Sequence, residues 1–340
     1  MSMLSRARRR AVPALAAGAL AALAAARAAG AAEAPGQVFA PNPVADLGIQ
    51  TLTDQKDADY FSALYPQAYH RVTLTDLDGS GTLTGAYAKV VSETGTPARN
   101  TGSGFVYTRD EDQFEQTMGY FWITQAQRYI QDLGFSSVNN RRQLLRINQF
   151  GGDNSFYRNG TSKLTITLGK GGVDDAEDAE VILHEYGHSV QDDQVPGFGS
   201  TADSGAIGEG FGDYLAGTVS DRYAPTADEA CVADWDSVSY TSRLPHCLRR
   251  LDGKKVYPQD LRKPREVHAD GEIWSASLWA FRSAVGARTA DRTIIEAQFG
   301  FKPDISMPDA ARVTIDTAQR LYGSRAATAA RSAFAAHGLA

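Results

Sequence analysis

The sequence predicts an α+β protein, in which a small β-rich region precedes a larger domain that begins with mixed structure and becomes mainly helical. Two observations carry this prediction. Residues 34–100 are rich in Gly, Thr and Asp and contain short runs in which apolar and polar residues alternate, as they do in half-buried strands. Beyond residue 112, long segments repeat apolar residues at helical spacing, and strands followed by helices are typical of α+β domains.

The elements of the larger domain are expected in a definite order. The first is a long helix at 112–133, which Gly134 ends. Two strand-like runs follow at 143–148 and 163–168. Acidic residues crowd 174–180 and favour the start of a helix there, because they suit the positive end of its dipole. The later predicted helices lie at 205–220, 268–285 and 308–322.

The composition is that of an ordinary globular chain. Of its 340 residues, 43% are hydrophobic and 22% are charged, which excludes wholesale disorder. The 32 Gly and 13 Pro show no three-residue period, so a collagen-like fibre is excluded as well. The formal charge of −6 argues against nucleic acid or an anionic membrane as the partner, because both attract basic surfaces.

The N-terminus has the three parts of a secretory signal peptide, which we predict to span residues 1–32. A basic stretch at 6–10 precedes an apolar stretch at 11–26, and small residues dominate 28–32. A lone membrane anchor is the alternative, but the apolar stretch is short of the roughly 20 residues that span a bilayer. The run of arginines also permits export by the twin-arginine route.

Removal of this leader would change the charge of the protein. The leader contains five arginines and no acidic residue, so the mature chain would carry −6 − 5 = −11. We therefore expect an acidic, soluble protein that is secreted or periplasmic and has no stable membrane association after cleavage. The sequence assigns no oligomeric state.

The two cysteines, Cys231 and Cys247, are predicted to form one disulfide. They lie 16 residues apart in a loop-like stretch of a chain that we expect to be exported, and disulfides persist outside the cytoplasm. A pair of free buried thiols is the alternative. A cysteine-based zinc site is not expected, because neither cysteine belongs to a close-spaced ligand pair.

Residues 33–105 are predicted to form the small β-rich region. Within them, Asp76–Gly81 resembles the start of an EF-hand calcium loop, but Tyr87 occupies the twelfth position, where a bidentate Glu is needed. A hairpin turn is the favoured interpretation.

The most informative segment is His184-Glu185-Tyr186-Gly187-His188, an HExxH pattern. Residues four apart on an α-helix face the same side, so His184 and His188 can share one metal ion. Two imidazole ligands suit zinc, and the carboxylate of Glu185 beside them can accept a proton from water on that metal.

A third ligand is expected from a following helix. Gln191 and Gln194 stand where metzincins have Gly and His, which excludes that arrangement. Glu209 follows His188 with 209 − 188 − 1 = 20 residues between them, and Asp213 lies four residues further along the same helical face. We expect Glu209 to complete the metal site and Asp213 to accept the second N–H of a ligand histidine.

The pattern of the gluzincin metallopeptidases matches this sequence at each of five positions: His184, Glu185, His188, Glu209 and Asp213. The chain resembles most the fungalysin-like family and is related to the thermolysin-like family. The resemblance runs from about residue 114 to the C-terminus and implies a thermolysin-like zincin fold, in which a mixed sheet with an edge strand precedes a mainly helical lobe. We therefore assign residues 106–340 to a zinc metallopeptidase domain.

Two further segments extend the resemblance. Residues 154–157, Asn-Ser-Phe-Tyr, are similar to the family's edge-strand segment, so Asn154 and Ser155 are expected to bind the substrate backbone. Residues 266–274 resemble the segment whose histidine hydrogen-bonds the oxyanion, which implies that role for His268.

The chain departs from the family at several points. The spacing between the second and third ligands is nearer to that of thermolysin than of fungalysins, and the stretch after the leader is shorter than the family's propeptide. Residues 197–200, Gly-Phe-Gly-Ser, supply no oxyanion-binding Tyr. A calcium ion is compatible with the resemblance, but the sequence does not assign acidic ligands to it.

The predicted function is that of a secreted zinc endopeptidase acting on protein or peptide substrates, with Glu185 as general base and His268 at the oxyanion. One alternative is a zinc-binding cell-envelope protein of the same fold without useful activity, which would not need those two side chains. Another is an exopeptidase, against which the absence of a GxMxN segment counts. The other histidines have no partner at ligand spacing and are expected to be structural: His70, His246 and His337.

Overall fold

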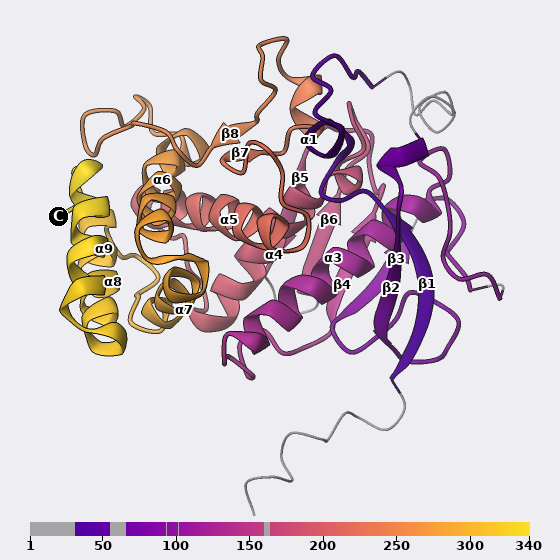
Figure 1. Ribbon diagram of the computed structural model, residues 1–340, viewed down its shortest axis with the longest axis horizontal. Helices are drawn as coiled ribbons and strands as arrows, with labels where there is room; N and C mark the ends of the chain where they lie inside the picture. The colour runs from indigo at the N-terminus through magenta and orange to yellow at the C-terminus, as the bar shows by residue number, and fades with distance from the viewer. Residues whose placement is uncertain (1–30, 55–65, 93, 101, 160–163) are drawn as a thin grey trace, which may run out of the picture.

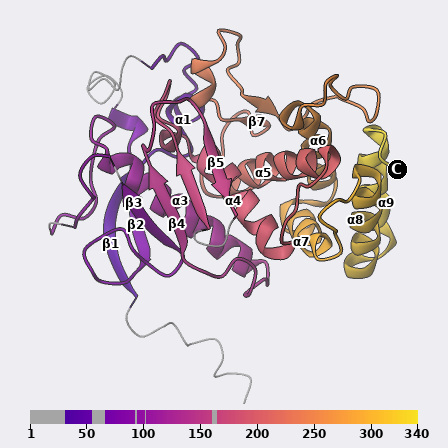
Figure 2. The same cartoon turned by 180° about the vertical axis from the view of Figure 1, so that it is seen from behind.

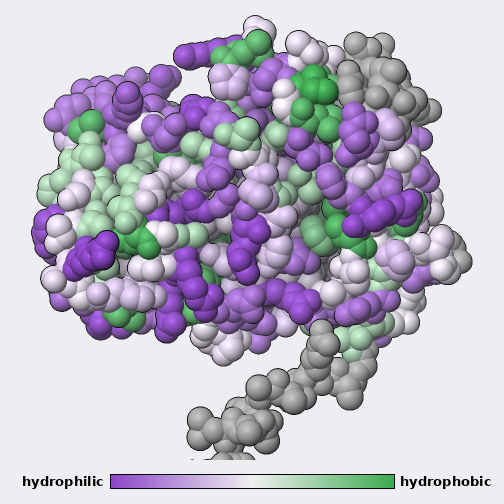
Figure 3. All heavy atoms as spheres, in the orientation of Figure 1, coloured by the Kyte–Doolittle hydropathy of each residue, from purple (hydrophilic) through white to green (hydrophobic). Residues whose placement is uncertain are grey.

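The computed structural model describes residues 31–340 except 55–65, 93, 101 and 160–163. The predicted signal peptide lies outside the described residues apart from its last two, so it stays a prediction. Within the described part of the chain, no helix combines the length and the apolar character that crossing a membrane requires. Hydrophilic residues cover most of the face seen in Figure 3, and hydrophobic residues form small separate patches on it.

The N-terminal region is built on an antiparallel pair of strands, β1 (Ala32–Val38) and β2 (His70–Leu77). A short helix, α1 (Pro43–Leu47), lies between them in sequence. The segment with partial EF-hand character, predicted to form a hairpin turn, overlaps the last two residues of β2 and continues as a bend that an antiparallel bridge between Leu77 and Gly85 closes. The Asp78 carboxylate accepts a hydrogen bond from the Ser80 backbone N–H at 2.9 Å.

A four-stranded sheet joins this region to the rest of the chain (Figure 1). Its order is β3-β4-β6-β5, with β3, β4 and β6 parallel and β5 antiparallel at the edge. Strands β4 and β6 correspond to the two predicted runs. Strand β3 comes from the N-terminal region, so backbone hydrogen bonds cross the predicted domain boundary at residue 105. The strands span Ala88–Ser92 (β3), Gln143–Ile147 (β4), Ser155–Arg158 (β5) and Thr165–Leu168 (β6).

Helix α3 (Gln113–Asp132) packs against this sheet and against β1, and it matches the predicted helix at 112–133. Its side chains Phe114, Met118 and Trp122 are fully buried. The Trp122 indole N–H donates to the Phe39 carbonyl at 3.2 Å, which ties the helix to the N-terminal region.

The remainder of the chain is mainly helical, as predicted. Figure 1 places α4 and α5 at the centre of the molecule and α8 and α9 at the end far from β1 and β2. Viewed from behind in Figure 2, β5 lies beside α4 and α5, and β5 contacts α4. Helices α7 and α9 were not predicted, because both are short and contain few large apolar residues. The helices span Ala179–Gln194 (α4), Ala202–Tyr223 (α5), Val267–Val285 (α6), Ala287–Gln298 (α7), Met307–Tyr322 (α8) and Ser324–Ala336 (α9).

A small hairpin, β7 (Cys231–Val232) with β8 (Arg249–Arg250), lies between α5 and α6 in sequence. Cys231 and Cys247 form a disulfide, as predicted. Single 3₁₀ turns occur at Pro66–Ala68 (η1), Asp175–Glu177 (η2) and Asp236–Ser239 (η3).

Candidate active site

Two histidines of helix α4 face helix α5. The rings of His184 and His188 lie 4.9 Å apart and almost perpendicular to each other. The helix begins before them at Asp178, whose side chain caps it by accepting the backbone N–H of Glu180 at 3.0 Å. The HExxH pattern is therefore on one helix, with both imidazoles on one side as expected.

Glycines let α4 and α5 approach closely at this point. A Cβ atom on Gly187 would lie 2.8 Å from the Cα of Gly212, and a Cβ on Gly212 would lie 2.8 Å from the Nδ1 of His184. Any larger side chain at either position would force the two helices or the imidazole to move. The close approach brings Glu209, one turn before Gly212 on α5, up to the histidines.

The three predicted ligands converge. The Glu209 carboxylate lies 3.1 Å from the Nε2 of His184 and 3.7 Å from the Nε2 of His188, and one ligand atom from each residue lies within 4.8 Å of the others. Atoms at the corners of a tetrahedron around a zinc ion are about 3.4 Å apart. The spacing and the two-nitrogen, one-oxygen donor set fit a single metal ion.

The electrostatics of these side chains also favour a cation between them. Burial alone would raise the pKa of Glu209, but the charge of His188 and the hydrogen bond and charge of His184 outweigh it and hold the pKa at about 2. Burial alone would lower the pKa of His184, but its hydrogen bonds to Asp213 and Glu209 raise it to about 10. A positive charge is thus stabilised where the three side chains meet.

Asp213 contacts the first histidine. Its carboxylate is fully buried and lies 2.8 Å from the Nδ1 of His184, which leaves the Nε2 directed toward Glu209. Arg249 binds both oxygens of the same carboxylate, each at 2.7 Å. Although burial raises the pKa of Asp213, the charge of Arg249 and the hydrogen bond and charge of His184 together outweigh that effect, and the pKa is lowered.

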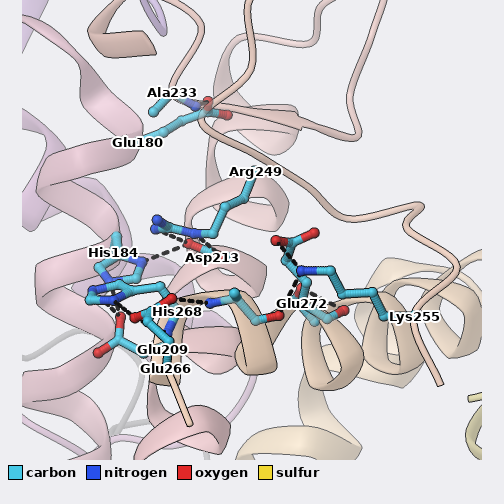
Figure 4. A network of polar contacts seen from close by, with 12 residues as sticks. Glu180, His184, Glu209, Asp213, Ala233, Arg249, Lys255, Glu266, His268 and Glu272 are labelled. Carbon is cyan, nitrogen blue, oxygen red and sulfur yellow. Dashed lines mark hydrogen bonds and ion pairs between the residues drawn. The ribbon is translucent and has the colours of Figure 1, made fainter. Parts of the chain in front are cut away.

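Sequence reasoning missed Arg249. It lies in strand β8, two residues after Cys247, and nothing in its local sequence distinguishes it from the arginine that follows. The disulfide and the pairing of Val232 with Arg249 hold it beside α5. Only the fold shows that it completes a chain of contacts from Arg249 through Asp213 to His184, which Figure 4 shows.

Glu185 is 6% exposed, and its Oε2 atom has no hydrogen-bond partner in the described part of the chain. The side chain lines a cavity of about 480 Å³ together with His184, His188, Glu209 and His268. A buried carboxylate oxygen without a partner is costly in a structural role. Glu185 is therefore placed as a group that can accept a proton from a molecule in the cavity.

His268 lies at the start of α6, on the rim of the same cavity. Its Nε2 is 3.3 Å from the Glu209 carboxylate, and its Nδ1 is 2.7 Å from the Glu266 carboxylate. Glu266 also caps α6 by accepting the backbone N–H groups of His268 and Ala269. This acid partner was missed, although it lies in the segment that singled out His268; Figure 4 shows both around Glu209.

The predicted substrate-binding residues lie on the opposite wall of the cavity. Asn154 precedes the edge strand β5, and Ser155 begins it; both line the cavity. The Ser155 hydroxyl donates a hydrogen bond to Asp175. Because β5 is an edge strand, its outer side has backbone groups available for another extended chain.

The remaining histidines have structural partners, as expected. His70 bonds to Asp46 at 2.7 Å. His246 contacts the Gln50 backbone carbonyl at 3.1 Å, and His337 contacts that of Lys255 at 2.8 Å.

Comparison with known proteins shows what this arrangement is similar to. Residues 158–289 match the family model of the fungalysin metallopeptidases (M36). The matched stretch includes the HExxH segment, Glu209, Asp213, Arg249 and His268. The chain is a metallopeptidase whose residues 158–289 are similar to the fungalysin family.

The fold of this metallopeptidase is similar to that of a protein whose structure has been solved. It is similar to the precursor of protealysin, a metalloproteinase from Serratia proteamaculans, with a TM-score of 0.58 and 15% sequence identity over 75% of this chain and 86% of that chain. The likeness establishes a thermolysin-like fold. No curated protein matches the chain significantly.

Proposed function

We propose that this metallopeptidase is a secreted zinc endopeptidase that hydrolyses peptide bonds within protein or peptide substrates. The observation that carries the proposal is the buried Glu185 side chain, which lines the cavity beside His184, His188 and Glu209. Its Oε2 atom has no hydrogen-bond partner among the described residues. These three side chains would hold the zinc ion. Nucleic acid is not an expected partner, because the chain carries a net negative charge.

Bound zinc would supply Lewis acidity, which polarises the scissile carbonyl and makes water more acidic. Glu185 accepts the proton as water attacks the carbonyl carbon, and then delivers it to the departing amine nitrogen. Such general acid–base catalysis typically contributes about 10²- to 10⁴-fold in rate. Burial in the cavity wall keeps this carboxylate facing the reaction instead of bulk water.

His268 donates a hydrogen bond from Nε2 to the oxygen that gains negative charge during the attack. The Glu266 carboxylate holds the opposite ring nitrogen at 2.7 Å and so keeps the ring turned toward the cavity. The substrate chain pairs along β5, and the Asn154 side chain contacts its backbone.

Glu185→Gln is the test of this proposal. The substitution removes the proton acceptor and preserves the size of the side chain, so zinc content and the circular dichroism spectrum should match the wild type. We expect cleavage of casein to fall by at least about 10²-fold. Wild-type proteolysis by this variant would contradict the proposed base.

The substrate panel separates the alternatives. An endopeptidase cleaves casein and peptides blocked at both ends, whereas an exopeptidase needs a free terminus. A zinc-binding envelope protein without activity would cleave none of them, with or without added zinc. Inactivation by a chelator and recovery on readdition of zinc would link cleavage to the metal.

A further inference from the structure

Three acidic side chains outside the catalytic group meet at a second place. Asp153 precedes β5, Asp175 begins the η2 turn, and Asp236 begins the η3 turn. One carboxylate oxygen from each lies within 4.8 Å of the other two. Two oxygens bound to the same calcium ion, each at about 2.4 Å, can be no more than about 4.8 Å apart.

Two of these carboxylates are buried without sufficient partners. Asp175 and Asp236 are 2% and 3% exposed, and the Oδ1 atom of each has no hydrogen-bond partner among the residues that the structure describes. The other oxygen of Asp175 accepts the Ser155 hydroxyl. The Tyr240 hydroxyl donates to Asp153 at 2.6 Å. Neither contact involves the buried Oδ1 atoms of Asp175 and Asp236.

In the described part of the chain, no basic side chain forms an ion pair with these acids. Arg249 acts on Asp236 only from a distance, because its guanidinium is paired with Asp213. Within the described ranges, no ion pair involves any of the three acids. Burial raises the pKa of Asp175 to about 7, and burial with the charges of Asp175, Asp178 and Asp153 raises that of Asp236 well above its usual range.

We propose that Asp153, Asp175 and Asp236 bind a calcium ion. The donor set contains only oxygen, which suits a hard cation, whereas zinc prefers nitrogen and sulfur ligands. Calcium binds six to eight oxygens in a flexible geometry, which suits three carboxylates that come from irregular segments. Water molecules would occupy the remaining positions around the ion. Magnesium usually uses one or two carboxylates in a strict octahedron.

The ion would connect segments that are distant in sequence. It links Asp153, two residues before β5, to the turns at η2 and η3, and Asp175 accepts a hydrogen bond from Ser155. If the proposed function is correct, the ion therefore also fixes the segment around Asn154 that would receive the substrate. Asp175 and Asp236 line a cavity of about 260 Å³, which provides an entry route for the ion.

The test measures calcium binding to the full chain carrying Glu185→Gln and loaded with zinc, so that autolysis and catalysis do not affect it. Equilibrium dialysis with radioactive calcium counts the bound ions, and thermal unfolding is followed with and without calcium. We expect saturating calcium to raise the unfolding temperature by about 5 °C. Asp236→Asn and Asp175→Asn should each bind one calcium fewer per chain and lose most of this rise.

Asp234→Asn is the matched control, because Asp234 is also a buried acid, two residues away, but does not belong to the three-carboxylate group. It should keep the calcium. Undiminished binding in both Asp236→Asn and Asp175→Asn, loss of the ion in Asp234→Asn alone, or no binding by the parent would each overturn the proposal. Sensitised terbium emission that calcium displaces provides a readout on the parent that requires no variant to fold.

Discussion

At the scale of single residues, the catalytic group depends on side chains that do not line the 480 Å³ cavity. The His184 ring is held by Asp213, and Asp213 is held by Arg249. A buried carboxylate with two ionic partners loses much of its stabilisation when one partner is removed. The orientation of a metal ligand therefore depends on a guanidinium from another part of the chain.

Arg249→Met tests this dependence. The variant leaves the Asp213 charge buried with only His184 as a partner, so we expect the free energy of unfolding to fall by about 3–5 kcal/mol. Zinc affinity should fall by about 10- to 100-fold. Urea denaturation and zinc titration measure the two effects.

Arg250→Met is the matched control for that variant. Arg250 is the neighbouring residue, but its ion pairs with Asp228 and Asp252 are solvent-exposed and contribute at most about 1 kcal/mol. Equal losses in both variants would show that the effect belongs to the hairpin and not to the Arg249–Asp213 pair.

Glu266→Gln tests the positioning of His268. One amide oxygen can still accept the backbone N–H groups that cap α6, but the charge beside the imidazole is lost. We expect kcat to fall by about tenfold with little change in KM or zinc content, because the hydrogen bond to the oxyanion forms mainly in the transition state. Steady-state kinetics on a blocked peptide measure this.

Glu272→Gln provides the comparison. Glu272 is on the same helix and is bound by Lys255 at 2.8 Å, away from His268. Its kinetics should match the wild type within about twofold. A KM effect of Glu266→Gln as large as its kcat effect would assign Glu266 to substrate binding instead.

At the scale of elements, the site is made where α4 and α5 cross. The helical spacing of 184 and 188 is local, so the sequence alone predicts that the two imidazoles face the same side. The distance between the helices depends on glycines, one on each, that permit backbone contact. That role is invisible in sequence, because a glycine inside a helix indicates only weak helix propensity.

Gly212→Ala tests the close approach. The new Cβ would lie 2.8 Å from the His184 Nδ1 and would push the imidazole away from Asp213. We expect the free energy of unfolding to fall by about 1–3 kcal/mol and zinc affinity to fall at least tenfold. Chemical denaturation and zinc titration report both.

Gly208→Ala is its control on the same helix. There only the flexible end of Gln191 lies within 3.4 Å of the new Cβ, so higher helix propensity should offset the crowding. A Gly212→Ala protein with the stability and zinc affinity of Gly208→Ala would refute the packing argument.

At the scale of the whole molecule, buried acids bind the parts of the chain together. Asp178 accepts the backbone N–H groups of Trp235 and Asp236, and Glu180 accepts that of Ala233, so the start of α4 holds the segment that follows β7. Arg109, from the stretch before α3, donates to Glu177 in the adjoining η2 turn. Asn42, from the predicted N-terminal region, donates to Asp178 at 3.4 Å, so these buried acids also connect the two predicted regions.

The close spacing of these buried acids predicts that the free energy of unfolding depends on pH. Burial, with the charges of Asp178 and Asp228, raises the pKa of Asp234 to about 8. A carboxyl whose folded pKa is raised contributes stability below its unfolded value of about 4 and loses that contribution as the pH rises through the folded value. In calcium-free buffer, Asp234→Asn should match the wild type at about pH 4 and exceed it by on the order of 3 kcal/mol at about pH 9.

Urea denaturation at the two pH values measures this difference. Asp316→Asn, on the exposed side of α8, should change stability little at either pH. An advantage of Asp234→Asn that is equal at both pH values would contradict the proposed titration.

The sequence by itself determined the α+β class, the strands β4 and β6, the helix α3, the disulfide pair and the residues His184, Glu185, His188, Glu209 and Asp213. These depend on local periodicity, on ligand spacing along a helix or on residue types that occur rarely. The sequence did not predict helices α7 and α9, because they contain few large apolar residues and are buried mainly by packing against neighbouring helices.

Only the tertiary structure decided which distant groups complete the site. Arg249 reaches Asp213 across 36 residues, and Asp153, Asp175 and Asp236 come together from three irregular segments. Ion pairs and carboxylate groups of this kind produce no periodic pattern in the sequence. Packing brings their members together, and the residue spacing of one helix or strand does not.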